Sequence, residues 1–133
     1  MEEMLREIQG IALREIGAAE ASAKLEEIRV RVLGKKGELT ALLRSANLYL
    51  GSDTGPMHLA AAVGTRCVGL FGSTRPEDSG PYGEGHICLQ AWYQSGTCRK
   101  RRKASNDAMR AITVEETCRA CERILLRNTS SAA

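Results

Sequence analysis

The chain has 133 residues, 43% of them hydrophobic and 26% charged, a composition typical of one ordinary folded domain and too short for two full ones. A formal net charge of +3 is too small to indicate a nucleic-acid-binding protein. No apolar run approaches the roughly 20 residues of a membrane span, and the acidic start M-E-E-M-L-R-E is unlike a signal peptide. We therefore expect a cytoplasmic protein.

Residues 1–45 contain no proline and show the periodicity of amphipathic helices. Apolar residues form one stripe on each of two helices, at Leu5, Ile8, Ala12 and Ile16, and at Leu25, Ile28 and Val32. The segment G-A-A-E-A-S offers a turn between them, and L-G-K-K-G ends the second helix with Gly34 as a C′ residue. We expect a helical hairpin that buries its stripes, followed by a short helix from Glu38 to about Ala46.

From residue 46 onward, short apolar runs alternate with a helix, in the order N-L-Y-L-G-S-D, G-P-M-H-L-A-A-A-V-G, R-C-V-G-L-F-G and H-I-C-L-Q. Strand, helix and strand in succession predict a parallel α/β unit. The segment S-T-R-P-E-D-S-G-P-Y-G-E-G is rich in turn residues and predicts a loop. A last amphipathic helix begins near Thr113, its expected N-cap, with Glu116 at the capping-box position, and residues 128–133 predict a disordered tail.

The stretch G-S-D-T-G-P-M-H places polar residues on the first turn of an otherwise apolar helix. If a strand precedes it, this turn lies at the carboxyl edge of a parallel sheet, where such sheets bind ligands. Unpaired amides of Gly55, Met57 and His58 would then face an anion, and a phosphate is the obvious candidate. Asp53 would accept a bond from a sugar hydroxyl or orient the turn. The residues alone equally allow a plain helix cap with His58 in the core.

Two other features carry weaker signals. Five consecutive basic residues form a candidate anion-binding run, for which a solvated loop is the favoured interpretation, at Arg99, Lys100, Arg101, Arg102 and Lys103. Cys118 and Cys121 form a C-x-x-C pair that Cys98 or His86 could extend, but a full zinc set at a recognised spacing is missing. We therefore expect free thiols, no metal and no cofactor.

Residues 46–127 resemble the C-terminal domain of bacterial ADP-heptose:lipopolysaccharide heptosyltransferases. The resemblance rests on D-T-G-P-M-H-L-A-A-A, then L-F-G-S-T, then G-P-Y-G, in this order and with short spacers. It implies half of a GT-B fold, which consists of two Rossmann-like domains, and a D-T-G-x-x-H turn that binds the nucleotide-sugar donor. Carried over by position, the donor contacts would be Asp53, Thr54, Gly55 and His58, with Thr74 as a weaker candidate on the same cleft.

The same resemblance implies what this chain should not do alone. In heptosyltransferases the aspartate that acts as base toward the acceptor lies in the N-terminal Rossmann domain, which has no counterpart here. We therefore expect no catalytic residue in this chain, and we regard it as a glycosyltransferase by resemblance only, without activity of its own.

Residues 1–45 resemble a different family, the N-terminal helical region of the phenylalanyl-tRNA synthetase α chain. The segment L-E-E-I-R-V-R-V-L-G-K-K-G-E-L-T carries the resemblance, which implies that Lys35 and Lys36 lie near a tRNA-contacting arm. The overlapping stretch G-E-L-T-A-L-L-R-S-A could belong to either parent. The sequence thus predicts a chimera of α/β class, in which a synthetase-like helical hairpin packs on a small parallel, partial Rossmann-like sheet.

Three functions follow from these observations. The first is a nucleotide-sugar-binding fragment whose partner is ADP or an ADP-sugar. The alternatives are a natural or engineered chimeric scaffold without a ligand and a tRNA-binding helical module, although nucleic acid is the less favoured partner. Because two or three parallel strands leave an edge and a face uncovered, we expect a homo-oligomer as readily as a monomer.

Overall fold

The computed structural model describes residues 1–97 and 105–130 and divides into two compact units, Met1–Ala46 and Asn47–Ala133. The basic run at residues 99–103, and Cys98 before it, lie outside the described residues. Within the described parts of the chain, no helix combines the length and the apolar character that a membrane crossing requires. The two units are described one after the other.

The N-terminal unit consists of three helices, α1 (Glu2–Gly17), α2 (Ser22–Leu33) and α3 (Glu38–Ser45). The predicted hairpin and short third helix are therefore confirmed. Gly34 caps α2 in an extended conformation, with φ −65° and ψ 170°. The expectation of a C′ glycine there is wrong, because the chain leaves this helix without a left-handed residue.

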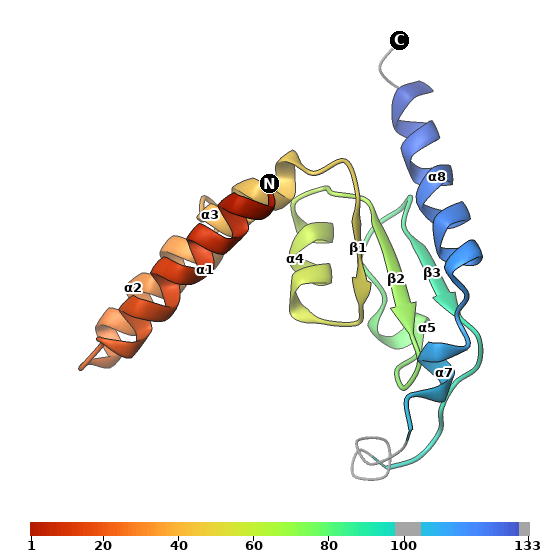
Figure 1. Ribbon diagram of the computed structural model, residues 1–133, viewed down its shortest axis with the longest axis horizontal. Helices are drawn as coiled ribbons and strands as arrows, with labels where there is room; N and C mark the ends of the chain where they lie inside the picture. Colours follow the sequence, from red (N-terminus) through yellow and green to blue (C-terminus); the bar gives the residue numbers. More distant parts are fainter. Residues whose placement is uncertain (98–104, 131–133) are drawn as a thin grey trace. The chain divides into compact units, whose positions relative to one another are not determined.

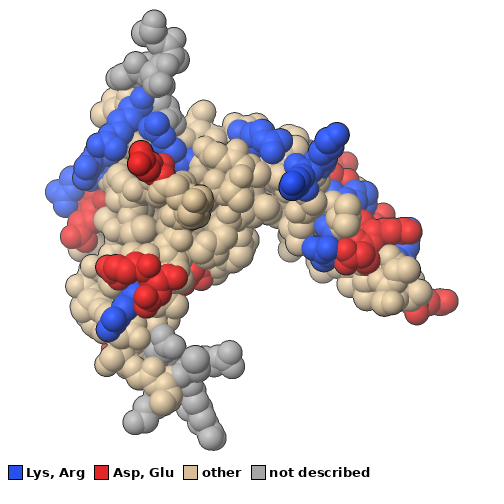
Figure 2. Space-filling view, turned by 180° about the vertical axis from the view of Figure 1, so that it is seen from behind, with Lys and Arg blue, Asp and Glu red and all other residues tan. Residues whose placement is uncertain are grey.

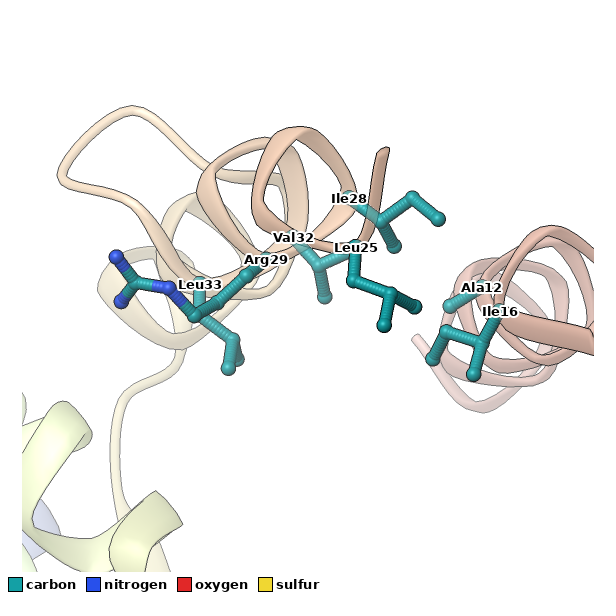
Figure 3. A pocket seen from close by; sticks show the side chains of 7 residues that line it. All are labelled: Ala12, Ile16, Leu25, Ile28, Arg29, Val32 and Leu33. Atoms are coloured by element: carbon teal, nitrogen blue, oxygen red, sulfur yellow. The ribbon is translucent and has the colours of Figure 1, made fainter. Parts of the chain in front are cut away.

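The apolar stripes of α1 and α2 face each other but leave a pocket between them (Figure 3). Ala12 and Ile16 of α1 lie across from Leu25 and Ile28 of α2, around a pocket of about 270 Å³. No residue of α1 is buried, and in α2 only Ile28 is. The hairpin thus has a thin core.

Ion pairs near the surface connect the three helices of this unit. Arg31 of α2 bonds the carboxylate of Glu15 in α1, and its Nη1 donates to Glu38 Oε1 of α3 at 2.9 Å. Figure 2 shows charged side chains of both signs interspersed along these helices. Partly exposed pairs of this kind add only about 0–1 kcal/mol each, so they supplement apolar packing and do not replace it.

The C-terminal unit is built on three parallel strands in the order β1-β2-β3, which confirms the α/β class. Tyr49 pairs with Cys67, and Val68 with Ile87. The elements in chain order are β1 (Tyr49–Ser52), α4 (Gly55–Ala62), β2 (Cys67–Phe71), α5 (Pro76–Ser79), β3 (Ile87–Gln90), α7 (Asp107–Arg110) and α8 (Val114–Ser130). The sequence predicts a loop for the whole segment after β2. This prediction is wrong in part, because Pro76 begins the one-turn helix α5.

Helices α4 and α8 cover the two faces of this sheet (Figure 1). Val68 packs with Ala120 and Ile124 of α8, all three buried. On the other face, Met57 of α4 is fully buried, and the Cys67 thiol lies 3.7 Å from the Met57 carbonyl oxygen. The alternation of side chains along β2 produces this division.

The ends of the helices follow local sequence rules. Gly64 adopts a φ of +88° just after α4, a left-handed conformation that commonly ends a helix. The Thr113 and Glu116 capping box is present, since the Glu116 amide donates to Thr113 Oγ1 at 3.2 Å and the Thr113 amide to Glu116 Oε2 at 3.1 Å. Helix α8 continues to Ser130, through the first residues of the segment predicted as a disordered tail.

Candidate functional site

The candidate site lies where β1 and β2 end. Asp53 and Thr54 follow β1 directly and lead into α4, while Thr74 follows β2 in the segment that leads into α5. Both segments lie at the carboxyl edge of the parallel sheet, which is the usual place for ligands in open α/β folds.

Asp53 is the centre of the site. Its Oδ1 lies 3.1 Å from Nε2 of His58, one turn into α4, and its Oδ2 accepts a hydrogen bond of 2.7 Å from the Ser79 hydroxyl. The Thr74 hydroxyl also bonds this carboxylate. The structure therefore brings three of the predicted residues, Asp53, His58 and Thr74, into one cluster.

The surroundings of Asp53 keep it ionised. Its side chain is only 14% exposed, and this burial raises the pKa of the carboxyl. The hydrogen bonds from Ser79, Thr74 and His58 oppose that effect and outweigh it, so the pKa lies below its usual value. An ionised Asp53 can only accept, so His58 Nε2 carries the proton that they share.

The expected row of free amides is wrong. The Met57 amide donates to the Thr54 carbonyl at 3.0 Å, and the His58 amide reaches the same oxygen at 3.5 Å. The first turn of α4 therefore closes on its N-cap Thr54, and Pro56 has no N–H to offer. Among the described residues, only the Gly55 amide of this turn has no hydrogen bond.

The outer surface of the turn is open. Thr54, Gly55 and His58 are exposed, and a Cβ placed at Gly55 would meet no atom within 4 Å. Thr54 occupies the N-cap position, but its hydroxyl donates to the Ser52 carbonyl at 3.2 Å. It makes no capping hydrogen bond to the amides of α4. The ring of His58 is 45% exposed and is not a core histidine.

Two residues that sequence reasoning missed complete the site. The sequence predicts a loop at Ser79 and no role for its side chain, yet its hydroxyl donates to Asp53 Oδ2 at 2.7 Å. Gln90, at the end of β3, donates from Nε2 to the Thr74 carbonyl at 2.7 Å. Both act across long stretches of sequence, and the only available signal was that polar residues stand at the ends of β3 and α5.

The arrangement is suited to binding, not to nucleophilic catalysis. Asp53 stands between Ser79 and His58, so the histidine does not contact the serine hydroxyl that it would have to activate. Cys118 is exposed and Cys121 half-buried, both as free thiols, and the described residues hold no cluster of three metal-ligating side chains.

Comparison with known proteins assigns the segment that carries this site to a family. The model of glycosyltransferase family 9 (heptosyltransferase) matches residues 13–109. The chain belongs to this family. Lipopolysaccharide heptosyltransferase 3 of Escherichia coli K12 is 35% identical over 98 residues, which are 71% of this chain and 28% of the enzyme. A family 9 segment therefore includes every described residue of the site, and its match begins well before residue 46.

A second group of relatives matches a shorter segment. The phenylalanine–tRNA ligase alpha subunit of Clostridium beijerinckii is 59% identical over 44 residues, 33% of this chain and 13% of the ligase. Both resemblances read from the sequence are confirmed, as a chimera predicts. The chain spans under a third of either relative's length. No solved structure matches the chain.

Proposed function

We propose that the C-terminal unit is a nucleotide-sugar-binding half-site of heptosyltransferase type, with the pyrophosphate of ADP or an ADP-sugar on the turn from Asp53 to His58. One observation carries the proposal: an exposed histidine is held by an ionised, mostly buried aspartate at the carboxyl edge of a parallel sheet. Membership of the heptosyltransferase family 9 supports a nucleotide-sugar as the ligand.

Each residue would have its own role in binding. Asp53 holds Nε2 of His58, so Nδ1 is the ring nitrogen left to face a phosphate oxygen, to which the charged form of the ring would donate. The Gly55 amide is a second donor, and the open space beside it lets a ligand approach the backbone. Thr54, with its hydroxyl on Ser52, lies beside them and is exposed.

The chain would have no transferase activity by itself. A general base must have a pKa near the working pH and be free to take a proton. Asp53 has a lowered pKa and three hydrogen-bond donors around it, so it is poorly suited to that task. The role of Asp53 in this proposal is to orient the ring of His58.

Isothermal titration calorimetry with ADP tests the proposal. We expect saturable binding of ADP by the wild type. His58→Ala should weaken binding about tenfold or more, because a hydrogen bond to a charged group contributes about 1.5–3 kcal/mol. Arg6→Ala, at a 76% exposed side chain in the N-terminal unit, is the control and should bind as the wild type does. No heat at millimolar ADP would contradict the proposal.

A second candidate function, tRNA binding, is favoured by the match to the phenylalanine–tRNA ligase alpha subunit. Lys35 and Lys36 are exposed directly after α2. A gel shift with tRNA that weakens with added salt and with Lys35→Ala and Lys36→Ala together would support it. A chain that binds neither ADP nor tRNA would be a scaffold only.

A further inference from the structure

A short segment after β2, residues 74–79, connects Asp53 to the rest of the sheet; we call it the strap. Two of its side chains bond the Asp53 carboxylate, Ser79 through a hydroxyl 2.7 Å from Oδ2 and Thr74 through its own hydroxyl. The Ser79 hydroxyl also lies 3.2 Å from the Arg75 carbonyl. Its single proton favours the shorter, charge-assisted bond to Asp53.

The strap is itself held in place. Gln90 Nε2 of β3 donates to the Thr74 carbonyl at 2.7 Å, and the Arg75 guanidinium stacks 4.4 Å from the centre of the Tyr93 ring. Within the strap, the Ser79 amide donates to the Arg75 carbonyl at 3.0 Å, which closes the turn of α5. The Ser79 hydroxyl is therefore presented from a fixed backbone.

These contacts fix which oxygen of Asp53 faces the histidine. Oδ2 is occupied by Ser79, so Oδ1 is directed at His58 Nε2, 3.1 Å away. Among the described residues, Asp53 is the only side chain that bonds the His58 ring. If the carboxylate were free to rotate, the exposed ring would lose its orientation.

We propose that Ser79 is a positioning residue: it locks the Asp53 carboxylate, which in turn aims His58 at a phosphate of the ligand. Through the strap, the end of β3 then contributes to the site without touching the ligand. This inference rests on the proposed nucleotide-sugar binding at the turn.

The test compares Ser79→Ala with the wild type in two measurements. The first follows the Asp53 carboxyl by ¹³C NMR titration without ligand, assigned by its loss in Asp53→Asn. We expect its pKa to rise when the serine hydroxyl is removed, because that bond favours the charged form. The second is the ADP affinity, which should fall about threefold to tenfold, the effect of one hydrogen bond.

Rescue and control variants exclude a merely structural effect. Ser79→Thr keeps the hydroxyl and should restore both the Asp53 pKa and the affinity. Ser45→Ala removes a hydroxyl that donates to the Leu42 carbonyl in the other unit, and it should change neither. If Ser79→Ala does not fold, Gln90→Leu releases the strap while Ser79 remains, and it should raise the Asp53 pKa as well.

The two measurements separate the inference from the function. An Asp53 pKa that stays at the wild-type value in folded Ser79→Ala would overturn the positioning role, whatever binds. A raised pKa with weaker ADP binding supports it. A raised pKa in a protein that binds no ADP at all would overturn the proposed function and, with it, the role of Ser79 toward a phosphate.

Discussion

At the scale of single residues, Asp53 makes the stability of the fold depend on pH. Its carboxylate is mostly buried, and two of its three hydrogen-bond partners are neutral hydroxyls, those of Ser79 and Thr74. Such bonds favour the charged form of the acid. Because the folded state holds Asp53 ionised more strongly than the unfolded chain does, its contribution to stability depends on pH.

The direction of this dependence can be predicted. The pKa of Asp53 is lower in the folded state, so its contribution is fully present above the unfolded value of about 3.9 and is lost as the pH falls through the lower folded value. Urea unfolding at about pH 6 and about pH 3 should show a smaller acid loss in Asp53→Asn than in the wild type. Equal losses in the two proteins would contradict this.

The sequence contained part of this site. Asp53 and His58 stand in a local pattern, D-T-G-x-x-H, so their proximity follows from one strand end and one helix turn. Ser79 lies 26 residues beyond Asp53, and only the path of the chain around β2 brings the two together. The sequence also did not show that the amides of Met57 and His58 are already hydrogen-bonded. Both donate to the carbonyl of Thr54, which depends on the backbone geometry of this turn.

At the scale of elements, the packing of α4 on β2 depends on one glycine. A Cβ placed at Gly69 would lie 2.7 Å from the Phe71 ring and 3.0 Å from the Met57 sulfur. Phe71 and Met57 are both fully buried. A side chain at this position would therefore force the Phe71 ring of the same strand, and the Met57 side chain of α4, to move.

Gly69→Ala should lower the free energy of unfolding by about 1–3 kcal/mol, the usual cost of overpacking a core. Gly55→Ala is the matched control, because a Cβ there meets open space and the φ is not positive. We expect it to change stability by less than about 0.5 kcal/mol. Chemical denaturation of both variants measures the difference, and equal stabilities would show that α4 does not pack as described.

Elements with local signals were predictable, and those without were not. The capping box at Thr113 and Glu116 and the left-handed Gly64 mark helix ends through contacts within a few residues. Helix α5 is not predictable in this way, because Ser79 and Gly80 are residue types typical of turns. The structure shows a single helical turn there, in which their amides donate to the carbonyls of Arg75 and Pro76.

At the scale of the whole molecule, the two units differ in how much they bury. Helix α1 has no buried residue, and Leu13 is 60% exposed. In contrast, Cys67, Val68 and Phe71 of β2 are fully buried. Segments with few buried apolar contacts open at lower free energy than core strands do.

Hydrogen exchange followed by mass spectrometry should therefore show a gradient along the chain. We expect the amides of α1 to exchange well before those of β2, because opening of α1 exposes little apolar surface. Protection of α1 equal to that of β2 would mean that the N-terminal helices are stabilised by contacts beyond their own unit.

The central claim, that the turn from Asp53 to His58 binds a nucleotide diphosphate, is tested most directly by NMR titration of the labelled full chain with ADP. We predict saturable chemical-shift changes for the Gly55 amide and the His58 ring. The signals of Ser79 should change over the same range of ADP concentration, and those of residues 1–46 should not change. Shifts confined to the pocket between α1 and α2, or none at millimolar ADP, would contradict it.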